Sequence, residues 1–180
     1  MAQGVHRPKQ PQLVRAKLLA AGAQLLSDGA SLSIGTVAES AGVTKGAVQH
    51  HFGTREELML AIYDELEAEF AEAVADDGSG ASAAWRYAKA SLEMHKSPAG
   101  SERWRALLIA SVVEPALSAR WSSWVKADRQ QDAQGSTKEL LARLAADGLW
   151  LSDALGIYKF SEAERDALAK EIQKLTKGEN

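Results

Sequence analysis

The chain of 180 residues contains no cysteine. This absence excludes a disulfide framework, a thiolate zinc site and a cysteine nucleophile. Histidine is scarce as well, with four residues and no pair at the i, i+4 spacing of a helical metal site. We therefore expect neither a bound metal nor another cofactor.

Long apolar stretches are also missing. No run reaches the roughly 18 residues that a membrane-spanning helix needs. The polar, basic start of the chain has no apolar segment of the kind found in a secretory signal. We expect no contact with a membrane and a cytoplasmic location.

Catalytic motifs are absent too. The chain has no Gly-Xaa-Ser-Xaa-Gly elbow, no phosphate-binding loop and no His-Glu pair at metal-ligand spacing. Two carboxylate pairs, Glu56-Glu57 and Asp76-Asp77, lie where one predicted helix starts and ends, as capping residues do. An enzyme is therefore the weaker hypothesis, and a binding protein is the stronger one.

Positive charge is concentrated in the first part of the chain. Residues 1–55 hold six Lys or Arg against two carboxylates, whereas the remaining residues hold fifteen against twenty-two. The net charge of −3 thus conceals a basic N-terminal part and an acidic remainder. Although so small an asymmetry can arise by chance, it favours a polyanion-binding surface near the N-terminus.

Apolar residues recur at helical spacing along most of the chain, and no segment alternates with a period of two over the length of a strand. The patterns predict helices at residues 12–28, 34–41, about 44–52, 55–76, 82–96, 101–113, 117–132, 136–155 and 161–176. Capping boxes begin at Thr54, Ser136 and Ser161. We predict an all-α protein with about nine helices.

Residues 34–52 have the features of a helix-turn-helix. A short helix ends before Gly42, which suits a sharp turn that needs positive φ, and a second short helix begins near Thr44, a good N-cap. This second helix carries several hydrogen-bond donors and almost no carboxylate. Such a helix suits the major groove of DNA.

The same region strongly resembles the DNA-binding domain of the tetracycline-repressor (TetR) family. The matching residues run from Ala38 to Phe52 and from Thr54 to Leu58. Gln49 stands where the family commonly has a tyrosine that contacts phosphate. Residues 147–151 resemble a stretch of the family's C-terminal part more weakly. The resemblance implies a basic arm at 1–9, a DNA-binding domain at 10–70 with its motif at 33–52, and a helical ligand-binding and dimerisation domain at 71–180.

The resemblance also implies a homodimer that places one recognition helix of each subunit in the major groove of an operator. We expect Lys45 to meet a phosphate or guanine, small residues to permit close approach, and Gln49 and His50 to face bases or backbone. For His51, a role in supporting the backbone contact and a direct DNA contact are equally good interpretations. For each of the other residues, the alternative is a solvated surface side chain. The predicted DNA-binding residues are Thr36, Thr44, Lys45, Gly46, Ala47, Gln49, His50, His51 and Arg55.

All five tryptophans lie after residue 84. Aromatic and Met side chains around a cavity suit a flat, largely apolar ligand, although an ordinary core is the better interpretation of any single Trp. Asp128, Asp147 and His95 are candidate polar anchors. The predicted ligand-binding residues are Trp85, Met94, Trp104, Leu108, Trp121, Trp124, Val125 and Trp150.

A stripe of apolar and small residues on the 136–155 helix suits the approach of a second helix, and intrachain packing is the alternative. The predicted dimer-interface residues are Leu141, Leu144, Ala145, Gly148, Ser152 and Leu155.

The resemblance implies a repressor that a small-molecule effector releases from double-stranded DNA by shifting the 55–76 helix. Two alternatives remain open. One is a regulator that responds to a protein partner and has no small-molecule ligand. The other is an activator of transcription.

Overall fold

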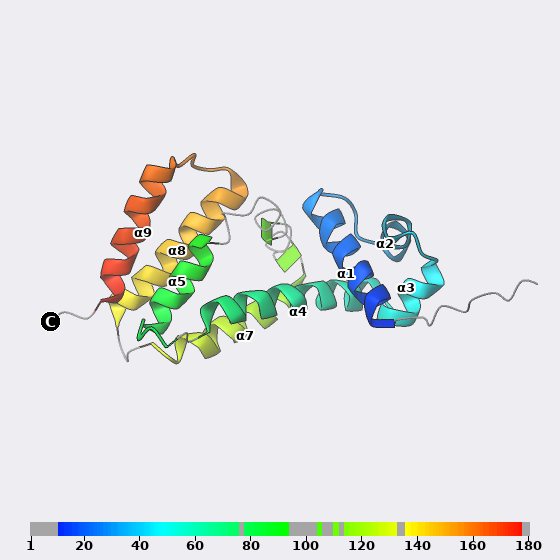
Figure 1. Cartoon of the computed structure of the whole chain (residues 1–180), viewed down its shortest axis with the longest axis horizontal. Helices are drawn as coiled ribbons and strands as arrows, with labels where there is room; N and C mark the ends of the chain where they lie inside the picture. The colour runs from blue at the N-terminus through cyan, green and yellow to red at the C-terminus, as the bar shows by residue number, and fades with distance from the viewer. Residues whose placement is uncertain are drawn as a thin grey trace, which may run out of the picture. The chain divides into compact units, whose positions relative to one another are not determined.

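The computed structural model describes residues 11–75, 78–93, 104–105, 110–111, 114–132 and 136–177 (Figure 1). All regular structure in these ranges is helical, so the prediction of an all-α fold is confirmed. Eight helices have described bounds: α1 (Pro11–Ser27), α2 (Ile34–Ala41), α3 (Lys45–Phe52), α4 (Arg55–Val74), α5 (Ala83–Glu93), α7 (Pro115–Arg129), α8 (Thr137–Leu155) and α9 (Glu162–Thr176). The predicted arm at 1–9 and most of the predicted 101–113 helix lie outside the described residues.

The chain forms two compact units, Met1–Ile62 and Tyr63–Asn180. Helix α4 contributes its first residues to one unit and its later residues to the other.

The first unit has an apolar core at the meeting of its short helices. Leu18 and Leu19 of α1, Val37 of α2 and Val48 of α3 are completely buried. Gly22 allows a close approach between helices, because an added Cβ there would lie 2.6 Å from Cδ1 of Ile62. This core holds α2 and α3 in a fixed relation to α1.

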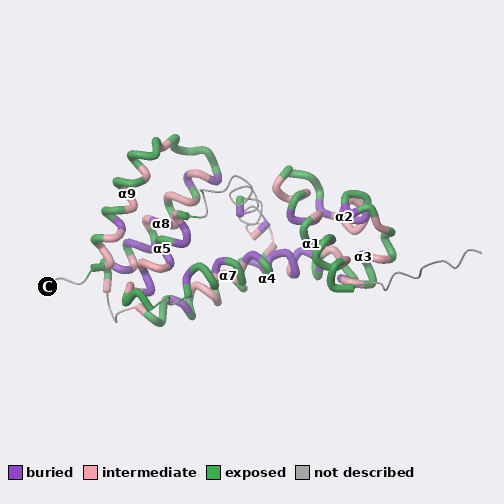
Figure 2. Tube along the Cα trace, in the orientation of Figure 1, coloured by how far each residue is buried: buried purple, intermediate pink, exposed green. Residues whose placement is uncertain are grey.

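In the second unit, α5, α8 and α9 pack against one another. Small side chains make this close packing possible: Ala88, Ala142 and Ala146 are completely buried and form one cluster with Ile172. Figure 2 shows buried positions on α5 and α8 and a largely exposed α9. Helix α7 also contacts α5, and a group of aromatic rings extends from there to α4.

None of the helices in the described ranges is long and apolar enough to cross a membrane.

Candidate functional site

The turn between α2 and α3 has the geometry that the sequence predicts. Gly42 adopts φ 63° and ψ 40°, and its N–H donates to the carbonyl of Glu39 while the N–H of Val43 donates to that of Ala38. This pattern of bonds closes α2 and turns the chain sharply. Thr44 then caps α3, with its hydroxyl oxygen accepting from the N–H of Ala47 at 3.2 Å. The segment is a helix-turn-helix.

Helix α3 has one buried face and one exposed face. Val48 and Phe52 are buried, and the guanidinium of Arg15 lies 5.3 Å from the centre of the Phe52 ring. Among the residues predicted to bind DNA, five on or beside α3 are exposed, and Ala47 and His51 are half-buried. The exposed five are Thr44, Lys45, Gly46, Gln49 and His50. A face rich in donors is therefore carried on an apolar support.

The side chain of Lys45 packs over Gly35. A Cβ added at Gly35 would be 3.2 Å from Cε of Lys45, so the aliphatic part of the lysine crosses the start of α2. Any larger residue at position 35 would push the lysine aside. Gly35 is a residue that the list of predicted contacts misses, because only the fold brings positions 35 and 45 together.

Thr36 and Arg55, two of the predicted DNA-binding residues, both have partners within the chain. The Thr36 hydroxyl accepts from the N–H of Ser33 at 3.0 Å and donates to the carbonyl of Ser31 at 2.9 Å. Arg55 donates from Nε to the carbonyl of Leu32 at 3.0 Å. Both residues fasten the segment before α2, and a DNA contact would have to share these groups.

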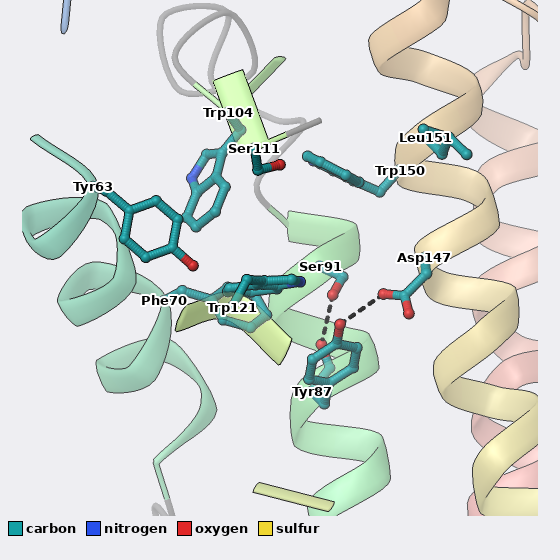
Figure 3. Close-up of a pocket in the computed structure, with 10 residues that line it drawn as sticks. All are labelled: Tyr63, Phe70, Tyr87, Ser91, Trp104, Ser111, Trp121, Asp147, Trp150 and Leu151. Atoms are coloured by element: carbon teal, nitrogen blue, oxygen red, sulfur yellow. Dashed lines mark hydrogen bonds between the residues drawn. The ribbon is translucent and has the colours of Figure 1, made fainter. Parts of the chain in front are cut away.

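The second unit contains a cavity of about 260 Å³ (Figure 3). Its described lining comes from four helices and from two residues between α5 and α7. These residues are Tyr63, Phe70, Tyr87, Ser91, Trp104, Ser111, Trp121, Asp147, Trp150 and Leu151. Most of the lining is aromatic, and polar atoms enter at a few places only.

Three of the predicted ligand-binding tryptophans, Trp104, Trp121 and Trp150, line this cavity. Trp124 is absent from the described lining and stacks on Trp121, with ring centres 5.3 Å apart. Val125 is half-buried and absent from the described lining. Met94 and Leu108, like His95, lie outside the described residues.

Trp85, grouped with the other tryptophans as a predicted ligand-binding residue, is not among the described residues that line this cavity. It packs against the alanine cluster of α5 and α8 and lines a separate groove bordered by α9. The reason is helical rotation: successive residues turn by about 100°, so Trp85 and Tyr87 point in nearly opposite directions from α5. Tyr87 is the α5 aromatic that faces the cavity.

Tyr63, Phe70 and Tyr87 line the cavity and are not among the predicted ligand-binding residues. Tyr63 and Phe70 are seven apart and therefore share a face of α4. The apolar repeat of α4 does include Phe70, but periodicity alone cannot distinguish a cavity wall from an ordinary core.

Asp147 is the carboxylate that reaches the cavity. It accepts a hydrogen bond of 2.7 Å from the Tyr87 hydroxyl (Figure 3). Burial raises the pKa of Asp147, while the Tyr87 hydrogen bond and nearby Arg143 lower it less strongly. Burial and the Asp147 charge in turn raise the pKa of Tyr87. The acid is thus kept in an environment that disfavours its charge.

Arg143, the neighbouring cation, is committed to other carboxylates. It donates to Asp128 at 2.8 Å and makes two bonds of 2.7 Å to Asp132. Its side chain is only 4% exposed and lies over the Tyr87 ring, 4.7 Å from its centre. Asp128, one of the predicted polar anchors, therefore neutralises Arg143.

The Tyr63 hydroxyl has an unusual position. Tyr63 is 3% exposed and lines the cavity, and its oxygen has no hydrogen-bond partner in the described part of the chain. Burial raises the pKa of this phenol, so it stays protonated and available as a donor. In Figure 3 the hydroxyl points toward the middle of the group of lining residues.

Four of the six predicted dimer residues, namely Leu141, Leu144, Gly148 and Leu155, form an exposed stripe on α8. Leu151 belongs to the same stripe by helical rotation and is 39% exposed. Ala145 and Ser152 lie at its edge: Ala145 packs on the alanine cluster, and buried Ser152 donates to the carbonyl of Gly148 at 2.7 Å.

Two family models match the chain. Residues 18–62 match "Bacterial regulatory proteins, tetR family", and residues 81–177 match "Tetracyclin repressor-like, C-terminal domain". The second match alone covers more than half of the chain. No curated protein matches the chain.

Several solved structures share the fold. A TetR-family member from Streptomyces coelicolor A3 has 22% identity and a TM-score of 0.72, with 92% of this chain and 99% of that one covered. A transcriptional regulator from Rhodococcus sp. Rha1 has 23% identity and a TM-score of 0.64, with 93% and 96% covered. The multidrug binding protein EbrR, complexed with imidazole, has 22% identity and a TM-score of 0.68, with 99% and 98% covered. EbrR structures with ethidium and malachite green match as well.

Proposed function

Because the chain belongs to the TetR family of transcriptional regulators, we propose that it is a repressor that binds a palindromic operator as a homodimer and is released by a small aromatic ligand. The observation that carries this proposal is the exposed, donor-rich face of α3, held on buried Val48 and Phe52. We assign DNA binding to residues 10–70, with a basic arm at 1–9, and ligand binding and dimerisation to residues 71–180.

On the operator, α3 would enter the major groove. Lys45 and the free amides at the start of α3 would meet phosphate, and Gln49 and His50 would face base edges or backbone. Gln49 offers both a donor and an acceptor, which suits an adenine edge. Thr44, Gly46, Ala47 and His51 would complete the contact, and Thr36 and Arg55 would flank it.

A second copy of the chain would cover the exposed stripe of α8. Leu141, Leu144 and Leu155 are each about half exposed, and a helix that presents such a stripe buries it against another element. Gly148 lies within the stripe, and an added Cβ there meets nothing within 4 Å in the same chain. Close approach of a partner helix explains a glycine at this place. The two recognition helices would then reach half-sites about 34–36 Å apart, or further.

The effector would occupy the cavity of the second unit. Aromatic walls with few polar groups are typical of small-molecule sites. EbrR, which has the same fold, is a multidrug binding protein with complexes of ethidium and malachite green, and this supports an aromatic ligand here.

Helix α4 would carry the signal. Tyr63 and Phe70 place ligand contacts on α4, and the same helix begins in the first unit at Arg55. A ligand that shifts α4 would change the spacing of the two recognition helices. A coupling free energy of about 1–3 kcal/mol would change operator affinity about 5–150-fold. We place the protein in the cytoplasm, where its operator lies, and assign it no enzymatic reaction.

The first test is a mobility-shift titration against the DNA upstream of the protein's own gene, at two salt concentrations, with excess random competitor. We expect competitor-resistant binding that weakens with salt and is released by an aromatic compound from a broad panel. Operator binding that no compound in the panel changes would contradict the effector role and favour control by a protein partner.

A further inference from the structure

The charges around the cavity are not balanced. On the Asp147 side, one guanidinium, that of Arg143, faces three carboxylates. Two of these, Asp128 and Asp132, already bond to it, and Asp147 has only the Tyr87 hydroxyl as a hydrogen-bond partner in the described part of the chain. Asp147 is half-buried, and a carboxylate removed from much of the solvent without a full counter-charge is costly. A bound cation would relieve that cost.

The same arrangement disfavours an anionic ligand. Arg143 uses three of its nitrogens on carboxylates and is almost fully buried. None of the described lining residues is cationic. An anion in this space would meet Asp147 and the electron-rich faces of aromatic rings, and both repel it.

The aromatic walls favour a cation independently of Asp147. Phe70 lies at the centre of a ring cluster, with its centroid 5.4 Å from Trp121, 5.7 Å from Trp104 and 5.5 Å from Tyr87. Aromatic faces within about 6 Å attract a cation, by about 2 kcal/mol or more when water is excluded. Rings on several sides allow a flat ligand to stack while its charge lies near Asp147.

The Tyr63 hydroxyl is a second, separate sign of a polar ligand. It is buried, points into the cavity and lacks a partner in the described chain. A buried donor without a partner costs about 1–3 kcal/mol, so a ligand that places an acceptor here would gain binding free energy. The volume of about 260 Å³ lies just below the range of about 300–1,000 Å³ for drug-sized ligands, which limits the ligand to a compact molecule.

We propose that the effector is a compact, planar aromatic cation, with Asp147 as its counter-ion and the Phe70–Trp121 side of the cavity as its stacking surface. This inference rests on the proposed role of the cavity as the effector site. It goes further in stating the charge and size of the ligand and the residue that selects them.

Three probes of nearly equal size and shape test the charge. N-methylquinolinium is a permanent cation, 1-methylnaphthalene is its neutral isostere, and 1-naphthoate is an anion. Isothermal titration calorimetry on the full chain should give at least about tenfold tighter binding of the cation than of the neutral probe. The anion should bind more weakly than either. Equal or tighter binding of the neutral or anionic probe, or no binding of the cation, would overturn the inference.

The variant Asp147→Asn tests the residue, because asparagine keeps the shape and can still accept from Tyr87. It should lose about tenfold or more of the affinity for N-methylquinolinium and keep its affinity for 1-methylnaphthalene within about twofold. Retained binding of the neutral probe shows that the variant is folded. Asp166→Asn, which removes the same charge from an exposed site on α9, is the matched control and should bind like the wild type. An unchanged cation affinity in Asp147→Asn would refute the role of Asp147.

Operator binding, measured on the same protein samples by mobility shift, separates the two levels of failure. If the wild type binds the operator but does not prefer the cationic probe, only the inference about the ligand's charge is overturned. If the wild type does not bind the operator at all, the proposed function itself is contradicted.

Discussion

The two units bury different kinds of side chain. Every buried polar or charged residue in the described part of the chain lies in the second unit: Ser91, Asp128, Glu139, Arg143 and Ser152. The first unit buries apolar side chains and displays its polar groups on the outside of α3. The first unit therefore offers its proposed ligand, DNA, exposed polar side chains on an apolar core. The second unit offers its proposed ligand polar side chains that lie inside the fold.

This difference has a physical basis in the two proposed ligands. A phosphate backbone is large and stays partly hydrated, so exposed donors can reach it. A small molecule must be enclosed before a few contacts can hold it. A site that encloses a ligand contains buried polar groups, and each needs a hydrogen-bond partner either in the protein or in the bound ligand. Predictions that alter one unit should leave the other intact.

The largest effect is expected where both functions depend on the dimer. A Cβ added at Gly148 meets nothing within 4 Å in its own chain, so we expect Gly148→Leu to clash with a partner helix. We expect a monomer by light scattering and a loss of about 10²–10⁴-fold in operator affinity, because the two half-sites are no longer linked. Ala68→Leu, at an exposed site on α4, is the control. A normal dimer in Gly148→Leu would refute the interface.

Arg143→Met tests the buried charges of the second unit. It leaves Asp128 and Asp132 buried without their cation, and the cost should be about 3–5 kcal/mol in the free energy of unfolding. The matched variant Arg165→Met breaks a more exposed pair with Asp153 and should cost about 1 kcal/mol or less. Denaturant unfolding measures both. Equal losses would show that burial does not separate the two pairs.

Lys45→Ala tests the exposed chemistry of the first unit. If Lys45 meets a phosphate, the variant should bind the operator more weakly, and the slope of log affinity against log salt should fall by about one. Lys126→Ala removes an equally exposed charge from α7 and should change neither quantity. An unchanged slope of log affinity against log salt in Lys45→Ala would contradict a contact between Lys45 and a phosphate.

The same substitution at two tyrosines should act in opposite directions. Tyr63→Phe removes a buried hydroxyl that has no partner in the described chain, so it should stabilise the ligand-free protein by about 1 kcal/mol. Tyr87→Phe removes the donor to Asp147 and should cost about 1–3 kcal/mol. Thermal unfolding compares the two variants directly. A destabilising Tyr63→Phe would mean that the hydroxyl is already satisfied.

The smallest effect concerns pH. Burial raises the pKa of Asp147 above its ordinary 3.8, so the folded chain binds this proton more tightly than the unfolded chain does. Its contribution to stability is therefore complete below pH 3.8 and is lost as the pH rises through the folded-state pKa. Tyr87 and Arg143 face the carboxyl, and Asp128 and Asp132 act on it through Arg143.

Asp147→Asn cannot titrate, so without ligand its stability relative to the wild type should increase as the pH rises. Unfolding curves from pH 4 to pH 8 check this, with Asp166→Asn as the control. A difference between Asp147→Asn and the wild type that does not change with pH would contradict the assignment.

The sequence predicts the first unit well because its signals are local. The turn at Gly42 and the cap at Thr44 both follow from residue types within a few positions of each other. The contact between Gly35 and Lys45 does not follow from local sequence, because it depends on how α2 and α3 pack.

The cavity is only partly predictable. The concentration of tryptophan after residue 84 points to the second unit, and Trp104, Trp121 and Trp150 line its cavity. Helical periodicity shows that a residue is buried but not what it packs against. It therefore does not separate Trp85, which lines another groove, from the tryptophans of the cavity, and it does not identify Tyr63 as a lining residue. The commitment of Arg143 to Asp128 and Asp132 depends on the contact of α7 with α8, which no short-range pattern reports.

The most direct test of the central claim is selection of duplexes from a random DNA pool by the wild-type protein, followed by sequencing. Sequence-specific binding by a symmetric dimer predicts enrichment of an inverted repeat with half-sites on one face of the duplex. The double variant Gln49→Ala/His50→Ala, altered only on the exposed face of α3, should lose or change that repeat. Enrichment of no sequence by the wild type, or of the same repeat by the double variant, would contradict the account.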